Sequence, residues 1–178
     1  MLLVLGDSFA HWASHRCVLP ASVVTAGRRG GRLDDEAFRQ WAIGVVFRSR
    51  PERVLLIVGG NDLAGPVFNA RHLHQMYEEL ISGVLAAGAG QVTVLPIPPR
   101  TACRPGGATV SAYRRRRRLM NLLLRRSFRR PRAASPVAFC PFTPGPGFVG
   151  RDGVHPSAEG WRELAAVILF VASAPPIA

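Results

Sequence analysis

Short apolar runs alternate with longer amphipathic segments along this chain. The apolar runs predict buried β-strands at Leu2–Leu5, Val23–Thr25, Val54–Val58, Val92–Leu95 and Val137–Phe139. The segments between and after them predict helices over residues 34–47, 69–87, 111–129 and 158–172. In the second of these, apolar residues keep the i, i+3, i+4, i+7 spacing of one buried helix face: Leu73, Met76, Tyr77, Leu80, Ile81, Val84 and Leu85.

The alternation of strands and helices determines the expected architecture. It predicts a parallel sheet with helices on both faces. A length of 178 residues suits one domain, and we expect it to span residues 1–178, because no internal repeat or second domain is visible. No stretch reaches the roughly 20 apolar residues needed to span a bilayer, and Ala165–Ala172 predicts a buried helix.

Four short segments carry the candidate chemistry. Three follow predicted strands and the fourth precedes the last helix: Gly6-Asp7-Ser8, Gly30-Gly31, Gly59-Gly60-Asn61-Asp62 and Asp152-Gly153-Val154-His155. Ligands in open α/β sheets bind at the carboxyl ends of the strands. The placement of these segments therefore predicts a single active site.

The residue types in these segments suit acyl transfer. A serine such as Ser8 needs a neighbouring base to become a nucleophile, and His155 is the candidate base. An imidazole needs a partner on its other nitrogen, and Asp152, three residues earlier, can supply it. Candidate donors to the oxyanion are the Ser8 N–H, a backbone N–H in Gly30-Gly31 and the Asn61 amide.

These segments resemble the four sequence blocks of the SGNH (GDSL-type) hydrolases. The matching residues are Gly6-Asp7-Ser8, Gly31, Gly59-x-Asn61-Asp62 and Asp152-x-x-His155, in the right order over nearly the whole chain. The resemblance implies a flavodoxin-like three-layer α/β/α sandwich with a parallel sheet of about five strands. It implies ester hydrolysis by a triad of Ser8, His155 and Asp152, with Ser8, Gly31 and Asn61 forming the oxyanion hole and no metal or organic cofactor.

The sequence departs from the family pattern in ways that bear on the site. Phe9 stands where the GDSL signature has Leu, and Thr25-Ala26-Gly27 precedes the glycines where the second block has a leading Asn. The donor is therefore Gly30 or Gly31, and we favour Gly31. The chain is short for the family, which leaves little room for a lid, so we expect a small ester such as an acetyl ester.

Basic residues suggest a second possible function. The formal net charge is +12, all 23 basic residues are Arg, and no acid lies between Glu79 and Asp152. Twelve Arg fall within residues 100–132, including the run Arg114, Arg115, Arg116, Arg117 and Arg118. Such a segment can bind a polyanion, and a solvated helix face explains it equally well.

A narrower resemblance fits this charge. The segment 3–13, the Arg-rich helix with Asn121 and the segment Arg151–His155 look like SGNH-like domains encoded by vertebrate mobile elements. The alternative to an esterase is therefore a mobile-element-derived domain that binds RNA or DNA through Arg114–Arg118 and does not depend on catalysis. A third possibility is an inert domain that serves oligomerisation, because Leu119–Leu124 is more apolar than one buried stripe requires.

The expected cellular compartment rests on two further observations. Cys17, Cys103 and Cys140 are odd in number and lack metal-ligand spacing, which favours a reducing compartment. The candidate nucleophile is residue 8, so cleavage of a signal peptide here would remove the site. We therefore expect an intracellular protein or a piece of a longer one.

Overall fold

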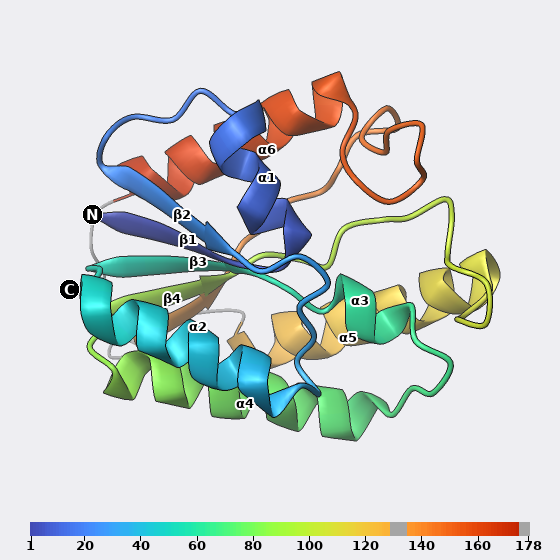
Figure 1. The fold of residues 1–178 in the computed structure, drawn as a ribbon, viewed down its shortest axis with the longest axis horizontal. Helices are drawn as coiled ribbons and strands as arrows, with labels where there is room; N and C mark the ends of the chain where they lie inside the picture. The colour runs from blue at the N-terminus through green and yellow to red at the C-terminus, as the bar shows by residue number, and fades with distance from the viewer. Residues whose placement is uncertain (129–134, 175–178) are drawn as a thin grey trace.

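Five parallel strands form one sheet in the order β2-β1-β3-β4-β5 (Figure 1). The structure is a computed structural model and describes residues 1–128 and 135–174. The strands are β1 (Leu2–Gly6), β2 (Val23–Gly27), β3 (Arg53–Ile57), β4 (Gln91–Val94) and β5 (Val137–Phe139). All five match the predicted strands to within two residues at each end.

Helices cover both faces of the sheet. They are α1 (Ser8–Arg16), α2 (Glu36–Ser49), α3 (Gly60–Leu63), α4 (Ala70–Ala86), α5 (Val110–Phe128) and α6 (Ala158–Ser173). Helices α1 and α6 lie on one face, and α2, α4 and α5 lie on the other (Figure 1). The short α1 and α3 add to the four predicted helices, and Arg129, the predicted last residue of α5, lies outside the described residues.

Alternating side chains along β1, an interior strand, divide the core between the two faces of the sheet. Leu2 and Val4 of β1 pack with α1 and α6, whereas Leu3 and Leu5 pack with α2, α4 and α5. Burial on both faces explains why the strands are continuous apolar runs. The result is a flavodoxin-like three-layer α/β/α sandwich, which confirms the predicted fold.

Close backbone approaches determine the shape of the sheet edge that carries the site. Gly6, the last residue of β1, pairs with Gly27 of β2 and Ile57 of β3. A Cβ at Gly6 would lie 1.8 Å from the Ile57 carbonyl oxygen, and one at Gly27 would lie 2.0 Å from the His11 nitrogen. Glycine at both positions therefore lets α1 start directly above the ends of these strands.

Candidate active site

Ser8 is the first residue of α1 and lies directly after β1. Asp7 caps the helix, because its Oδ1 accepts a hydrogen bond of 3.0 Å from the Phe9 N–H. The Asp7 N–H donates to the Ile57 carbonyl at 3.1 Å, which ties the turn to β3. Ser8 is thus held at the carboxyl edge of the sheet, and Asp7 has the structural role of a helix cap.

His155 and Asp152 lie on the loop before α6 and reach Ser8. His155 Nε2 lies 3.0 Å from Ser8 Oγ, and His155 Nδ1 lies 2.6 Å from Asp152 Oδ2. The Phe9 ring packs 5.9 Å from the imidazole, measured between ring centroids. The structure therefore brings the predicted nucleophile, base and carboxylate into one chain of hydrogen bonds.

Local contacts keep Asp152 ionised. Its Oδ1 accepts hydrogen bonds of 2.9 Å from both the Val154 and the His155 N–H. Partial burial acts to raise the pKa of Asp152, but the Val154 N–H and the contacts with His155 outweigh it and lower that pKa below its usual value. The carboxylate is thus a stable partner for an imidazolium.

Asn61, at the start of α3, lies between two neighbouring loops. Its side-chain nitrogen donates to the Gly31 carbonyl at 2.9 Å, and its Oδ1 accepts from an Arg100 guanidinium nitrogen at 2.9 Å. An amide nitrogen has two hydrogens, so one remains for a ligand. The next residue, Asp62, accepts hydrogen bonds from the Leu33 and Asp34 N–H at 2.8 and 3.2 Å, which fastens the glycine loop to α3.

The two glycines of that loop differ in how their N–H groups are used. The Gly31 N–H donates to the Arg28 carbonyl at 3.0 Å. Gly30 has a φ of +73°, a Cβ built there would lie in open space, and no acceptor bonds its N–H among the described residues. This geometry argues against Gly31, the predicted donor, and favours Gly30, because a bonded N–H is not free to bind an oxyanion.

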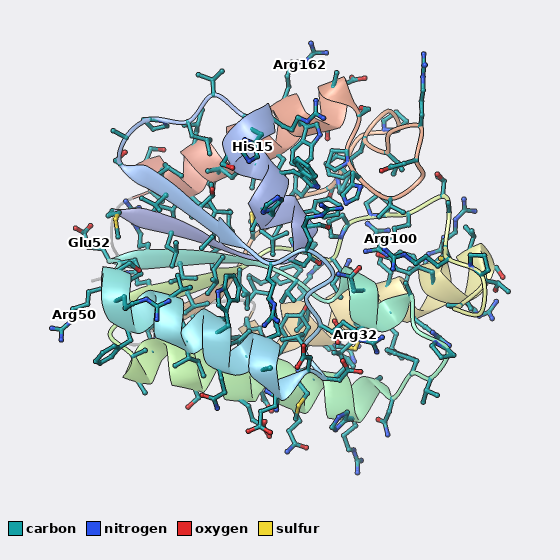
Figure 2. All side chains as sticks on the ribbon, viewed as in Figure 1. His15, Arg32, Arg50, Glu52, Arg100 and Arg162 are labelled. Carbon is teal, nitrogen blue, oxygen red and sulfur yellow. The ribbon has the colours of Figure 1, made fainter. Side chains whose placement is uncertain are left out.

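Arg100 is the residue of this site that the sequence prediction missed. It follows Pro98-Pro99 on the loop after β4, is only 6% exposed, and lies next to α3 (Figure 2). Its guanidinium carbon lies 5.5 Å from the centre of the Tyr113 ring, and a Cβ at Gly60 would meet its nitrogen at 2.9 Å. The only available signal was an Arg at the carboxyl edge of the sheet, which the high Arg content obscured.

Two buried carboxyl groups, those of Asp7 and Asp62, lie next to Ser8 and Asn61 in the sequence. Burial raises the pKa of Asp7 to about 7, although the Phe9 N–H and the Arg100 charge act to lower it. Burial likewise raises the pKa of Asp62 to about 6, against the lowering effect of the Asp34 N–H. The Asp62 Oδ2 is buried without a hydrogen-bond partner among the described residues. Arg100 is thus the cation that acts on the Asp7 carboxyl, whereas Arg32 acts on that of Asp62.

A family model decides the assignment that this geometry suggests. The model of the GDSL-like lipase/acylhydrolase family matches residues 4–162. The chain belongs to this family. It is a carboxylic ester hydrolase by that membership, and the match extends from β1 into α6.

Solved structures show the same fold at low sequence identity. A lipase/acylhydrolase from Enterococcus faecalis is 17% identical with a TM-score of 0.67, and the match covers 98% of this chain and 97% of that one. A carbohydrate esterase of family 3 from Talaromyces cellulolyticus is 17% identical with a TM-score of 0.63, covering 98% and 99%. A catalytic mutant of an acetylxylan esterase from Geobacillus stearothermophilus is 15% identical with a TM-score of 0.58, covering 99% and 95%. No curated protein matches this acylhydrolase by sequence.

The Arg-rich segment of this acylhydrolase does not form one uniform face. Arg116 donates to the carbonyls of Leu63, Gly65 and Pro66, and Arg117 donates to the Ile97 carbonyl. Arg114, Arg115 and Arg118 are exposed. Two of the five therefore hold loops near the site, and nucleic-acid binding and mobile-element origin stay predictions.

Other features of the acylhydrolase bear on metals and membranes. Cys17, Cys103 and Cys140 are free thiols, and burial raises the pKa of Cys140 to about 11. Across residues 1–128 and 135–174, no group of three or more His, Cys, Asp or Glu side chains could hold a metal ion. Within the same ranges, no helix is both long and apolar enough to cross a membrane.

Proposed function

We propose that this acylhydrolase is a serine esterase that cleaves a small ester through an acyl-enzyme on Ser8. The observation that carries the proposal is the continuous contact from Asp152 through His155 to Ser8, at 2.6 and 3.0 Å, across a separation of 147 residues. A hydroxyl that touches an imidazole oriented by a carboxylate is the arrangement that activates serine.

The distances assign a role to each atom. His155 Nε2 takes the Ser8 Oγ proton as Oγ attacks the ester carbonyl, and Asp152 stabilises the imidazolium that forms. His155 then gives that proton to the oxygen of the leaving alcohol. Water then cleaves the acyl-enzyme. His155 takes a proton from the water as its oxygen attacks the acyl carbon, and His155 returns this proton to Ser8 Oγ as the acid leaves.

We assign three donors to the oxygen that becomes negative. They are the Ser8 N–H, the Gly30 N–H and the second hydrogen of the Asn61 amide nitrogen. Arg100 is a positioning residue, because its bond of 2.9 Å to Asn61 Oδ1 fixes the amide and polarises it toward donation. Donors held before the reaction starts need little reorganisation when charge develops.

Acetyl esters are the first substrates to test. One structural neighbour is an acetylxylan esterase, and its match covers 99% of this chain.

Fluorophosphonate labelling tests the proposal, because the probe reacts with activated serines. We expect the wild type to be labelled and Ser8→Ala to be unlabelled. Ser14→Ala is the matched control, because Ser14 lies on the same helix but is exposed and bonds only the His11 carbonyl. A wild type that is folded by circular dichroism yet unlabelled would contradict the proposal.

A further inference from the structure

A recess of about 760 Å³ opens beside the catalytic histidine. Its lining includes His155 and Asp152, Trp12 and Arg16 of α1, and Arg29, Arg151 and Trp161. The recess thus combines two indole rings with three guanidinium groups directly beside the residues that we assign to proton transfer.

The three arginines are not neutralised by neighbours. Arg16, Arg29 and Arg151 are exposed, and within the described part of the chain none of them has an ion pair or a side-chain hydrogen bond. By contrast, Arg32 on the same loop as Arg29 is paired with Asp34 at 2.6 Å. The recess therefore keeps a positive potential that a ligand can use.

Two contacts shape this potential. The Arg29 guanidinium carbon lies 5.5 Å from the centre of the Trp12 ring, within cation–π range. Asp152 is the acid in the lining, and its charge is already engaged by the His155 ring and two N–H groups. An anion in the recess would meet the arginines while the carboxylate is held by its own partners.

The position of the recess decides which part of an ester it receives. The oxyanion lies on the Asn61 and Gly30 side of Ser8. The leaving alcohol must lie on the side of His155, because this imidazole protonates its oxygen. A recess lined by His155 is therefore placed for the alcohol portion.

We propose that this recess binds the alcohol portion of the substrate and that this portion carries a carboxylate or phosphate beside a ring or other apolar part. The inference rests on the proposed function and adds the substrate class to it. The arginines attract the anion, and Trp12 and Trp161 pack against the apolar part.

Matched aryl acetates test this selectivity. The probes are 4-carboxyphenyl acetate, which is anionic, and 4-carbamoylphenyl acetate, which is neutral and of nearly the same shape. Each kcat/KM is divided by the hydroxide-catalysed rate of that ester to correct for the leaving group. We expect the wild type to prefer the anionic ester by about tenfold at low salt, and the preference to fall as salt screens the partly exposed charges.

A triple variant identifies the source of the preference. In Arg16→Gln/Arg29→Gln/Arg151→Gln we expect the ratio of the two corrected kcat/KM values to fall toward one. The control is Arg48→Gln/Arg71→Gln/Arg126→Gln, which removes the same charge from exposed positions on α2, α4 and α5, across the sheet from α1 and α6. In this control we expect the wild-type ratio to remain.

The outcomes separate this inference from the proposed function. Equal corrected rates for the two esters in the wild type, or a ratio that the first triple variant leaves unchanged, would overturn the anionic substrate class alone. Hydrolysis of neither ester, together with absent fluorophosphonate labelling, would overturn the esterase proposal itself. A third ester, 4-acetoxyphenyl phosphate, distinguishes the anions: a ratio above that of the carboxylate assigns the recess to phosphate, and a lower one assigns it to carboxylate.

Discussion

The two sides of Ser8 are built differently. On the proposed oxyanion side, Asn61 and Asp62 lie on α3 and bond the glycine loop, and Arg100 reaches Asn61 from the loop after β4. Both Asp62 and Arg100 are 6% exposed. On the base side, Asp152 and His155 lie three residues apart on one loop, with side chains 54% and 32% exposed. Interlocked buried contacts hold the first side, whereas a local turn holds the second.

This difference changes the electrostatics on each side. Burial raises the pKa of Asp7 beneath the oxyanion side, whereas hydrogen bonds from Val154 and His155 lower the pKa of the exposed Asp152 despite its partial burial. A buried donor network can be precise, but it makes the charge state of its carboxyls sensitive to pH. The exposed Asp152 carboxylate stays ionised, because its pKa is lowered.

Breaking the base side should have the largest effect. We expect His155→Ala to lower kcat by about 10⁴ to 10⁶, because Ser8 then has no base, and Asp152→Asn to lower it by about 10² to 10⁴. The measurement is the hydrolysis rate of an aryl acetate. His72→Ala, an exposed histidine on α4, is the control. Activity within tenfold of wild type in His155→Ala would rule out His155 as the base.

Removing the side-chain donor should have the next largest effect. We expect Asn61→Ala to lower kcat by about 10² to 10³, as loss of one oxyanion donor does. Asn69→Ala is the matched control, because Asn69 only caps α4 through a bond to the His72 N–H. It should cost about 1 kcal/mol of stability without this loss in kcat. A full rate in folded Asn61→Ala would show that the amide does not contact the oxyanion.

Substitution of Arg100 tests whether this residue contributes to kcat by orienting the Asn61 amide. We expect Arg100→Gln to lower kcat by about tenfold to hundredfold, as loss of a charged hydrogen bond does, with KM much less affected. Added to Asn61→Ala, it should lower kcat little further, because both changes act through the same amide.

Arg116→Gln is the control for that experiment. Arg116 also donates to carbonyls and lies over an aromatic ring, that of Phe68, but it does not contact Asn61. If Arg116→Gln lowered kcat as much as Arg100→Gln, or if the Asn61 and Arg100 effects multiplied independently, Arg100 would not position the amide.

Asp7 should affect stability rather than rate, through the pH dependence of the free energy of unfolding. Its pKa is about 7 in the folded state, against an ordinary value of 3.8, so the folded state binds more protons than the unfolded chain between these values. The free energy of unfolding should therefore fall as pH rises through this window, by up to about 1.4 kcal/mol per pH unit from this group. In Asp7→Asn this component disappears, while the amide oxygen still caps α1.

Urea unfolding of both proteins from pH 4 to 8 measures the difference. Asp35→Asn is the control, because Asp35 caps α2 by the same kind of bond at an exposed position. A difference between wild type and Asp7→Asn that does not change with pH would contradict the raised pKa.

The pH dependence of stability has the opposite sign for Asp152, whose lowered pKa contributes stability that is lost as pH falls below about 4.

Much of the molecule could be predicted from sequence because its causes are local. Buried parallel strands need continuous apolar runs, and these placed all five strands to within two residues. Asp152 and His155 share one loop, so their spacing alone predicted their contact. Ser8 was predicted as the candidate nucleophile because it follows Gly6-Asp7 directly at the end of a strand, where a side chain reaches the edge of the sheet.

Only the tertiary structure supplies the contacts on which the proposed oxyanion side and the proposed alcohol side rest. The sequence left Gly30 and Gly31 open because hydrogen bonding of the Gly31 N–H to Arg28 depends on backbone conformation. Arg100 reaches Asn61 from 39 residues away, and Arg16, Arg29 and Arg151 meet in one recess from three separate segments. In a chain whose basic residues are all Arg, composition cannot separate the arginine that orients an amide from those that face solvent. The burial of each arginine and its hydrogen-bond partners make that distinction, and both arise only when the chain is folded.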